Sequence, residues 1–377
     1  MKTDLYYDAV VAGGGPAGAL AAYTCFTGGA TTAILEKKKL PRHKACSGII
    51  IPRSADIITS EFGKIPAHVF SDPVEVKAMR MHFSSGRKLD LPLQGLSVKR
   101  HLFDQWLCGV SGAEILDGTT LVSFSEKTRE VELVCRKEQE FKIHCRVLIA
   151  ADGGDSNIAR HIDPARHKGL TWYLALQEVY DCRSDLEPGV FHFFAIPGIS
   201  PYASAYIKDA RFVVEVVVRQ EQNIHKHMAR LLEFLKKHMD AGNAKRIRRI
   251  GCRVTYAAAN GSYCFGTPRI LVAGEASGLL NPFGEGISSA LASGLIAGEA
   301  ALTGINENFA PGDLYHREIE AEKTITESQF KAATLLSGTV PAFRWKSGLA
   351  SLPWKERILL GKDLISWYLR VRAGGKT

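Results

Sequence analysis

The sequence has little of what a metal-binding or disulfide-stabilised protein needs. Its 377 residues include eight cysteines, but these are scattered along the chain and form no C-x-x-C pair. This spacing excludes a zinc ribbon and a compact disulfide framework, and it favours a reducing, cytoplasmic location. His225 and His227 would face different directions on a helix, and no third ligand follows nearby in the sequence, so no metal site is expected.

Long hydrophobic runs are also rare. The one long uncharged stretch, residues 9–35, contains Pro16 and six glycines, which suits neither a membrane span nor a signal sequence. The sequence shows no internal repeat and no low-complexity tract. The composition, 46% hydrophobic and 23% charged, is that of a folded protein with a substantial core, and it excludes a mostly disordered or fibrous chain.

The charge is unbalanced toward the basic side. With 48 Lys and Arg against 39 Asp and Glu, the net charge is +9, which favours an acidic partner such as nucleic acid, a lipid surface or a phosphorylated ligand. The sequence contains no recognisable nucleic-acid-binding module, so nucleic acid is not expected. Residues 341–377 combine eight basic residues with three tryptophans. We expect this region to be helical and either to contact a membrane surface or to cover an edge of the fold.

A strand–helix–strand unit is expected near the start of the chain. Residues 6–12 form an apolar run that predicts a buried strand, the Ala- and Leu-rich residues after Gly18 predict a helix, and residues 31–36 predict a second strand. The G-x-G-x-x-G motif between them has the spacing of a dinucleotide-binding loop. Glu36 ends the second strand, where it would accept hydrogen bonds from ribose hydroxyls. An acid there favours FAD or NAD over NADP, and the motif does not separate the first two.

Each glycine of this motif has a physical task. Gly13 permits the tight turn, Gly15 lets the backbone approach a pyrophosphate closely, and Gly18 lets the helix pack against the strand. The helix N-terminus, at Pro16 and Ala17, presents free N–H groups and the positive end of the helix dipole to the phosphates.

Two later motifs separate FAD from NAD. A strand at residues 146–151 leads into Asp152-Gly153-x-x-Ser, and a strand at residues 269–273 leads into G-E-A-S-G-L-L-N-P-F-G-E-G-I, which starts at Gly274. This order of motifs resembles the FAD proteins of the p-hydroxybenzoate hydroxylase fold. The last segment resembles, more narrowly, the geranylgeranyl reductase family, whose pattern is G-D-A-A-G-x-x-N-P-x-x-G-E-G-I. Helix geometry gives the same indication independently of the resemblance. The N–H groups at the start of the helix after Gly286 are expected to point outward and to stabilise a flavin ring.

Two shorter segments extend the resemblance. Lys44-x-Cys46-Ser47-Gly48 is similar to the family's K-x-C-G-G segment, and R-x-x-F-D-x-x-L from Arg100 is similar to its R-x-x-F-D-x-x-L helix. Glu275 stands where the family usually has Asp, and Ser47 stands where it often has Gly. The motif and the resemblance together assign FAD contacts to Gly13, Gly15, Pro16, Ala17, Gly18, Glu36, Lys37, Lys44, Cys46, Ser47, Gly48, Arg100, Asp152, Gly153, Gly274, Glu275, Gly284, Gly286 and Ile287.

The order of elements predicts an α/β protein with a discontinuous architecture. We expect a Rossmann-type FAD-binding domain at residues 1–70, 97–162 and 264–340, an inserted, largely antiparallel substrate sheet at residues 71–96 and 163–263, and a C-terminal helical region at residues 341–377. The inserted sheet would lie over the flavin and supply a substrate cavity, as in the fold that the sequence resembles. The proposed walls of this cavity are Phe191, Phe193, Tyr202, Tyr206 and Pro282. Aromatic residues that alternate along a strand often belong to the hydrophobic core, so a core position is the alternative for these residues.

Cys46 is the candidate catalytic residue. The resemblance places it near the flavin ring, and the neighbouring Arg42, His43 and Lys44 are expected to lower its pKa by their charge. A polarised thiol there could donate a proton, orient the substrate or shield the flavin edge. The alternative is a small residue in a tight loop with no chemical role.

The resemblance implies an FAD-dependent oxidoreductase. We expect it to reduce C=C bonds of an isoprenoid or another apolar substrate by hydride transfer from N5 of the reduced flavin. A class A flavin monooxygenase or a flavin halogenase is the first alternative, although no W-x-W-x-I-P segment supports halogenation, and a flavin electron-transfer protein is the second. No second G-x-G-x-x-G motif follows a later strand, so the electrons must come from an external donor: NAD(P)H, a ferredoxin-like protein or a quinone. The predicted location is the cytoplasm, with peripheral contact to a membrane.

Overall fold

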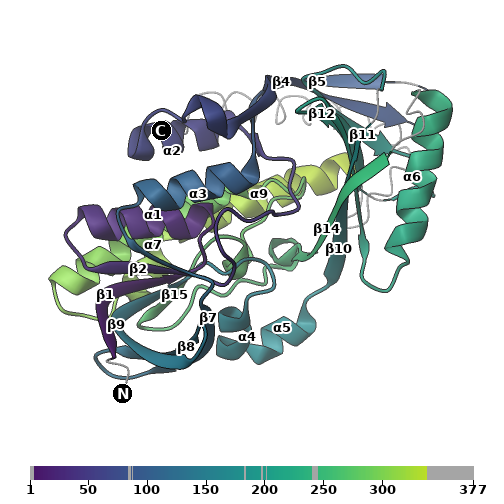
Figure 1. Cartoon of the computed structure of the whole chain (residues 1–377). Helices are drawn as coiled ribbons and strands as arrows, with labels where there is room; N and C mark the ends of the chain where they lie inside the picture. The colour runs from purple at the N-terminus through teal and green to yellow at the C-terminus, as the bar shows by residue number, and fades with distance from the viewer. Residues whose placement is uncertain are drawn as a thin grey trace.

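The computed structural model of the protein describes residues 4–337, with gaps at 84–85, 87, 182–183, 197, 201 and 240–244. The expected C-terminal helical region, 341–377, lies outside the described residues. Two β-sheets lie side by side in the described part (Figure 1). Most helices pack around the first sheet, at the left of Figure 1, whereas α6 (Ile224–His238) lies on the outer side of the second.

The first sheet is mixed, and its parallel part contains the strand–helix–strand unit that the N-terminal motif predicts. β1 (Leu5–Ala12) pairs in parallel with β2 (Thr32–Glu36) and β9 (Glu140–Ala150), so that Val11 lies opposite Ile34 and Ile149. These strands are buried on both faces, which is why their sequences read as continuous apolar runs. The full order is β6-β2-β1-β9-β8-β7, with β15 also paired to β9. The other strands are Glu114–Asp117 (β6), Thr120–Glu126 (β7), Val131–Arg136 (β8) and Ile270–Val272 (β15).

Three helices cover one face of this sheet: α1 (Pro16–Thr27), α3 (Arg100–Val110) and α7 (Ile287–Asn306). Small residues let α1 and α7 approach closely, since a Cβ atom added to Gly294 would lie 2.3 Å from the carbonyl oxygen of Ala17. Among the described helices, α7 alone has the length and apolar composition of a membrane span, and most of it is buried inside the fold. We therefore assign α7 as a core helix of the nucleotide-binding domain.

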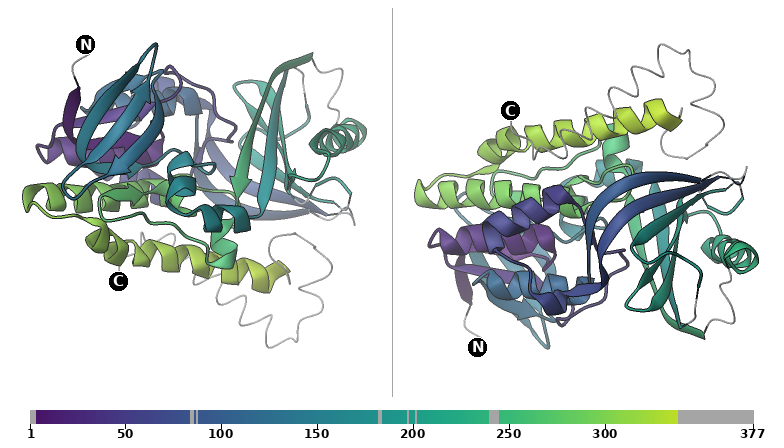
Figure 2. Two further views of the ribbon diagram at one scale, coloured as in Figure 1. Left: turned by 90° about the horizontal axis from the view of Figure 1, so that it is seen from below. Right: turned by 90° about the horizontal axis from the view of Figure 1, so that it is seen from above.

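A further long helix lies beside α7. This helix, α9 (Glu320–Ser337), reaches toward the second sheet (Figure 2). The others are Pro52–Phe62 (α2), Asn157–Ile162 (α4), Pro164–Gly169 (α5) and Gly312–Glu318 (α8), with short 3₁₀ turns at Ala67–Val69, Ala257–Asn260 and Gly274–Ser277.

The second sheet has the order β14-β10-β13-β12-β11-β4-β5-β3, and it is antiparallel except for the parallel pair of β4 and β11. Met228, Leu231 and Leu235 of α6 pack on its outer side. Its strands are Ile49–Ile50 (β3), Phe70–Phe83 (β4), Lys88–Val98 (β5), Trp172–Asp181 (β10), Val190–Ala195 (β11), Tyr202–Lys208 (β12), Arg211–Arg219 (β13) and Lys245–Thr255 (β14).

The expected α/β class and the inserted, largely antiparallel sheet are confirmed. β14 was not expected, because its sequence K-R-I-R-R-I-G-C-R-V-T is dominated by cations. It forms the edge of the sheet, where Arg246 and Arg249 reach the carboxylate of Glu178, which is only 1% exposed. The pairing of the backbone and this buried counter-charge stabilise a strand that local composition disfavours.

A buried histidine pair joins two strands of the second sheet. Nε2 of His82 lies 2.9 Å from Nδ1 of His192, so one nitrogen donates and the other accepts. Nε2 of His192 is buried and has no partner among the described residues. Burial and the nearby cations lower the pKa of His82 to about 4, and burial and His82 lower the pKa of His192 to about 3. Both rings are therefore neutral at pH 7.

This pair predicts acid sensitivity. In the unfolded chain both histidines would bind protons below about pH 6.5, whereas the folded pair does so only near pH 4 and below. The unfolded state therefore binds more protons in this window, and the stability is expected to fall as the pH falls from 6.5 toward 4. Urea unfolding at several pH values measures the effect. The double variant His82→Leu with His192→Phe is expected to lose less stability over this range than the wild type, and an equal loss would contradict the prediction.

Candidate active site

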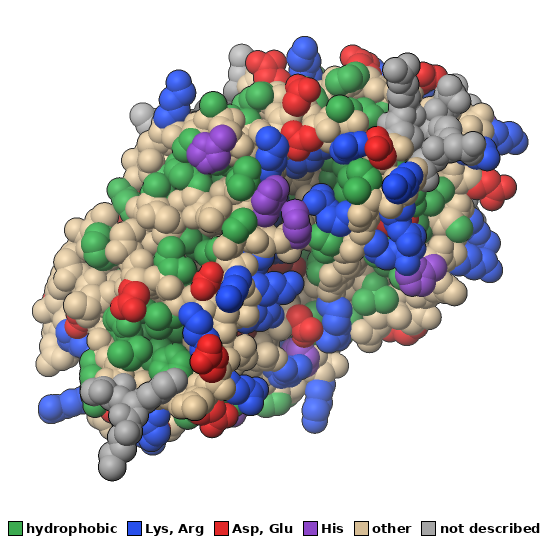
Figure 3. Space-filling model, viewed as in Figure 1, with side chains coloured by type: hydrophobic (Ala, Val, Ile, Leu, Met, Phe, Trp, Pro, Cys, Tyr) green, Lys and Arg blue, Asp and Glu red, His purple; other side chains and the backbone are tan. Residues whose placement is uncertain are grey.

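A cleft between the two sheets brings the sequence motifs together. One part is a groove of about 390 Å³ that runs along the glycine loop, and the other is a cavity of about 180 Å³ that reaches the second sheet. Lys and Arg side chains gather around this hollow on the surface (Figure 3). The groove is lined by Gly13, Gly15, Glu36, Lys37, Lys44, Asp152, Gly153 and Glu275, and the cavity by Gly15, Pro16, Ala17, Lys44, Cys46, Ser47, Arg100, Gly153, Gly274, Glu275, Gly284, Gly286 and Ile287.

The glycine loop has the geometry that a pyrophosphate needs. Gly13 has a φ of +115°, and a Cβ atom there would lie 2.3 Å from the carbonyl oxygen of Ala151. A Cβ atom on Gly18 would lie 1.9 Å from the carbonyl oxygen of Gly13, so the helix packs against the turn without a side chain. Gly15 differs from Gly13 and Gly18, because a Cβ atom added there would have no protein atom closer than 3.9 Å. The space in front of Gly15 is therefore free for a ligand.

Glu36 lies in a network of buried charges beside this loop. Its Oε2 atom accepts hydrogen bonds from the N–H of Gly14 at 3.2 Å and from Nε of Arg42 at 2.9 Å. Arg42 also donates to Asp104 at 2.9 Å, and Asp104 in turn pairs with Arg100. Sequence reasoning gave Arg42 and Asp104 no part in the cofactor site, although Asp104 belongs to the R-x-x-F-D segment.

The network predicts a large stability role for Asp104, which is fully buried. Asp104→Asn removes the charge that compensates Arg42 and Arg100, so we expect a loss of about 3 kcal/mol in the free energy of unfolding. Urea unfolding should show a lower midpoint with an unchanged slope. Glu320→Gln, which breaks an exposed pair with Lys323, is the matched control and should cost less than about 0.5 kcal/mol. Equal midpoints for the two variants would contradict this role.

The expected electrostatic neighbours of Cys46 require a correction. Arg42 points to Glu36 and Asp104, His43 contacts Arg248 at 3.3 Å, and Nζ of Lys44 lies 3.9 Å from Glu275. Consecutive side chains of this loop point in different directions, so closeness in the sequence does not make them partners of the thiol. The cations at Cys46 come from other elements instead: Arg100 on α3 forms a hydrogen bond with it, and Lys208 on β12 lies close by.

The Cys46 segment is held by strands of the second sheet. Sγ of Cys46 accepts from the N–H of Gly48 at 3.4 Å, and the Cys46 carbonyl oxygen accepts from the amide of Gln177 at 3.2 Å. Nζ of Lys208 donates to the carbonyl oxygens of Ser47 and Val98. Burial lowers the pKa of Lys208 to about 8, although the thiol of Cys46 and nearby carboxylates favour its charged form. These contacts fix the candidate thiol in the lining of the cavity.

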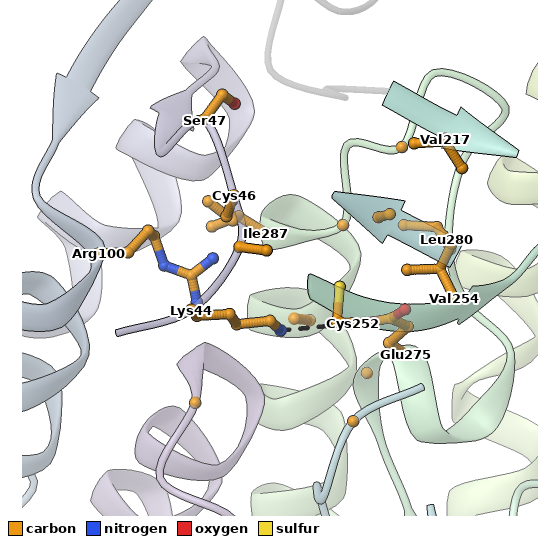
Figure 4. A pocket seen from close by; sticks show the side chains of 18 of the residues that line it. Lys44, Cys46, Ser47, Arg100, Val217, Cys252, Val254, Glu275, Leu280 and Ile287 are labelled. Atoms are coloured by element: carbon orange, nitrogen blue, oxygen red, sulfur yellow. Dashed lines mark ion pairs between the residues drawn. The ribbon is translucent and has the colours of Figure 1, made fainter. Parts of the chain in front are cut away.

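Cys46 and Ile287 lie on one side of the cavity, and Val217, Val254 and Leu280 lie on the other (Figure 4). The second sheet also contributes a polar cluster that sequence reasoning missed. Oε1 of Glu215 accepts from Gln177 at 2.5 Å and from the hydroxyl of Tyr206 at 3.0 Å, and its Oε2 accepts from Ser204 at 3.1 Å. Only the pairing of three strands brings these residues together, so no local signal could have identified the cluster.

The start of α7 differs from the expectation. The N–H groups of Ile287 and Ser288 do not point freely outward, since both donate to Oε1 of Glu285 at 2.9 Å. The E in the G-E-G motif therefore caps the helix with its own carboxylate. The N–H of Gly286 has no hydrogen-bond partner among the described residues. Gly284 and Gly286 both line the cavity. Burial raises the pKa of Glu285, and its bonds to Ser288 and Ile287 oppose that shift.

Of the five proposed cavity walls, the structure places Tyr202 in the lining of the cavity. Phe191 and Tyr206 stack with ring centroids 5.1 Å apart and line a small neighbouring pocket instead. Phe193 is buried against Tyr202, and Pro282 is buried beside the cavity. These four aromatic residues belong to one apolar cluster of the second sheet, so their positions along and across the strands, and not the face on which they lie, decide which of them lines the cavity. Tyr256 lines the cavity as well, and it was missed because it follows the unexpected strand β14.

The residues of the cleft fit FAD. The glycine loop offers backbone N–H groups and free space to a pyrophosphate, and the Gly284–Gly286 segment offers a backbone donor to a flavin ring. Oδ1 of Asp152 is buried at the groove and has no partner among the described residues, whereas Oδ2 accepts from the N–H of Asn157 at 3.0 Å. An orphaned buried carboxylate oxygen indicates a missing donor, such as a ligand hydroxyl. The fold and this cleft define an FAD-dependent oxidoreductase.

Comparison with known proteins confirms this class. The chain belongs to the FAD binding domain family, which matches residues 6–196, and its sequence is similar to proteins named as geranylgeranyl-type reductases. Digeranylgeranylglycerophospholipid reductase of Methanocaldococcus jannaschii is 29% identical over 80% of this chain and 78% of its own length. A Methanopyrus kandleri protein of the same name, numbered 1, is 29% identical over 93% of this chain and 95% of its own length.

A solved structure agrees with the fold. The geranylgeranyl bacteriochlorophyll reductase-like protein of Thermoplasma acidophilum superposes with a TM-score of 0.77, at 20% identity, over 96% of this chain and 100% of that one. The predictions of FAD as cofactor, of an oxidoreductase and of a resemblance to the geranylgeranyl reductases are thus confirmed. The individual FAD contacts, the catalytic role of Cys46 and the domain boundaries stay predictions.

Proposed function

We propose that the protein reduces C=C bonds of an isoprenoid or another apolar substrate. The apolar wall of the cavity, directly beside the proposed flavin contacts, carries this proposal. Val217, Val254, Leu280 and Ile287 supply it. A hydrocarbon chain gains about 25 cal/mol for each Å² of apolar surface that leaves water for such a wall. Relatives named digeranylgeranylglycerophospholipid reductase support the same substrate class.

The chain's own residues have distinct roles in this proposal. When bound, reduced FAD supplies the hydride. Gly13, Gly15 and Gly18 hold the pyrophosphate against the start of α1, and Glu36 accepts hydrogen bonds from the ribose. Cys46 donates the proton that completes the reduction, and Arg100 lies beside its sulfur.

An external donor supplies the electrons, and the basic rim of the cleft supports an anionic one. Arg246, Arg248 and Arg249 are exposed on β14, the strand that also lines the cavity with Cys252 and Val254. NAD(P)H, a ferredoxin-like protein and a quinone are the candidates, of which the first two are anionic. A cytoplasmic location and contact of residues 341–377 with an anionic membrane surface belong to the same proposal.

Anaerobic flavin oxidation tests the function. The FAD-loaded protein is reduced with dithionite, excess reductant is removed, and geranylgeraniol or geranylgeranyl diphosphate is added in detergent micelles. We expect the flavin to be reoxidised without oxygen and the product to gain two hydrogen atoms, which mass spectrometry detects. A sample without prenyl compound is the control.

Two other results would contradict the proposal. If no prenyl compound reoxidises the flavin, and an aromatic compound stimulates reoxidation only with oxygen, the protein is a monooxygenase or halogenase. If only a protein acceptor such as a cytochrome reoxidises it, the protein transfers electrons and reduces no small substrate.

A further inference from the structure

Two tyrosine hydroxyls in the cavity have no hydrogen-bond partner among the described residues. Tyr202 on β12 and Tyr256 after β14 both line the cavity, and their rings are held from behind. The ring of Tyr202 packs edge-on against Phe193 at 4.9 Å, and that of Tyr256 packs edge-on against Tyr173 at 5.3 Å. Neither hydroxyl is sealed away from the cavity, because neither belongs to the fully buried unpaired atoms of the described part.

The two hydroxyls belong to one small region beside the proposed flavin contacts. The hydroxyl oxygen of Tyr256 lies 3.7 Å from the position that a Cβ atom on Gly284 would take. Tyr202 lies within electrostatic reach of Tyr256, Glu215 and Cys46. Burial raises the pKa of both tyrosines above the usual value for a phenol, so both keep their protons at pH 7 and act as hydrogen-bond donors.

These donors do not match a plain hydrocarbon. A substrate with only C–H groups at this place would bury two O–H donors without acceptors, and each buried unsatisfied group costs about 1–3 kcal/mol. Glu215 does not remove the cost, because the hydrogen bonds that it accepts come from Tyr206, Gln177 and Ser204 and not from Tyr202 or Tyr256. A carbonyl oxygen has two lone pairs and can accept from two phenols at once.

We propose that Tyr202 and Tyr256 bind a carbonyl oxygen conjugated with the C=C bond that is reduced, so that the substrate is an oxygenated isoprenoid, an enal or enone. This inference rests on the proposed function and names its substrate class. The carbon distant from the carbonyl takes the hydride, and the π electrons move onto the carbonyl oxygen, which becomes an enolate oxygen. The two phenols stabilise this charge as an oxyanion hole does. The carbon next to the carbonyl then takes a proton, restoring the C=O bond and leaving a saturated carbonyl product.

A measurement of ligand binding tests this proposal independently of the enzyme's activity. Farnesal, an α,β-unsaturated prenyl aldehyde, and farnesene, a hydrocarbon of the same chain type, are titrated into the oxidised holoenzyme in calorimetry. We expect farnesal to bind at least about tenfold more tightly than farnesene. Tyr202→Phe and Tyr256→Phe should each weaken farnesal binding about tenfold without changing farnesene binding. Tyr173→Phe is the matched control, because the Tyr173 hydroxyl bonds with Arg219.

The rate of flavin reoxidation gives the second readout. With the reduced enzyme and farnesal, Tyr202→Phe and Tyr256→Phe should each slow reoxidation about 10²- to 10³-fold, as the loss of an oxyanion-hole donor does. Phenylalanine keeps the ring, so the fold is expected to survive, and circular dichroism checks this.

The possible outcomes separate the two claims. If farnesene and farnesal bind equally and reoxidise the reduced enzyme at equal rates, the carbonyl proposal is overturned and the reduction of apolar C=C bonds stands. If no prenyl compound reoxidises the enzyme, the proposed function fails and the carbonyl proposal fails with it. If farnesal binds more tightly than farnesene but Tyr173→Phe weakens farnesal binding as much as the two cavity variants do, the assignment of carbonyl binding to Tyr202 and Tyr256 is overturned.

Discussion

Gly15→Val is expected to abolish FAD binding while the protein stays folded. Gly15 is extended, with φ −97° and ψ −177°, so any residue can adopt its backbone conformation. An added Cβ atom meets no protein atom closer than 3.9 Å, so a valine side chain would extend into the space that the motif reserves for a pyrophosphate. We expect the dissociation constant for FAD to rise more than about a hundredfold, which corresponds to about 3 kcal/mol.

Flavin fluorescence during titration of the apoprotein measures this binding, and thermal unfolding of the apoprotein checks the fold. Gly109→Ala is the matched control: Gly109 lies in α3, nothing surrounds its added Cβ atom, and both FAD binding and folding should be preserved. Gly18→Val, by contrast, should damage the fold itself because of its 1.9 Å contact with Gly13. A Gly15→Val variant that binds FAD like the wild type would show that the pyrophosphate does not approach this loop.

Cys46→Ala is expected to keep FAD bound and to lose about 10²- to 10⁴-fold in the rate at which a prenyl substrate reoxidises the reduced flavin. This is the usual contribution of a positioned proton donor. Sγ of Cys46 accepts a hydrogen bond from the N–H of Gly48 and lies beside Arg100, so the thiol is held in place in the lining of the cavity. Anaerobic single-turnover mixing measures the rate, and a separate FAD titration shows that the cofactor site is intact.

Cys252→Ala provides the control for this prediction. Cys252 lines the same cavity, but burial raises the pKa of its thiol to about 11, which makes it a poor proton donor at pH 7. Its replacement should change the rate only a few-fold. If Cys46→Ala reoxidises at the wild-type rate, Cys46 is a small residue in a tight loop, and the proton comes from another group.

Local sequence predicted the cofactor domain well because its signals are local. The apolar run of β1, the three glycines and Glu36 lie within one strand–helix–strand unit, so their spacing alone defines the turn, the close approach and the helix start. The same holds for the segment from Gly274 to Ile287, whose residues follow one another along the chain. In both places the neighbours in the sequence are also the neighbours in space.

The cavity could not be predicted in this way. Arg42, next to the Cys46 segment in sequence, pairs with Glu36 and Asp104, whereas Arg100, on a distant helix, reaches the thiol. Glu285, which looked like part of a cofactor motif, caps its own helix. Such outcomes depend on the direction in which a side chain points, and a few degrees of backbone rotation change that direction without changing any motif.

The sequence by itself determined the class of this protein: a Rossmann-type nucleotide-binding domain, FAD as cofactor, and a resemblance to the geranylgeranyl reductases. Only the tertiary structure decided what surrounds the substrate. Gln177, Tyr202, Glu215 and Tyr256 come from different strands or strand ends, and they meet because backbone pairing sets the register of β10, β12, β13 and β14. Register depends on pairing across the whole sheet, including an edge strand rich in arginine, and therefore no local pattern in the chain encodes the polar end of the cavity.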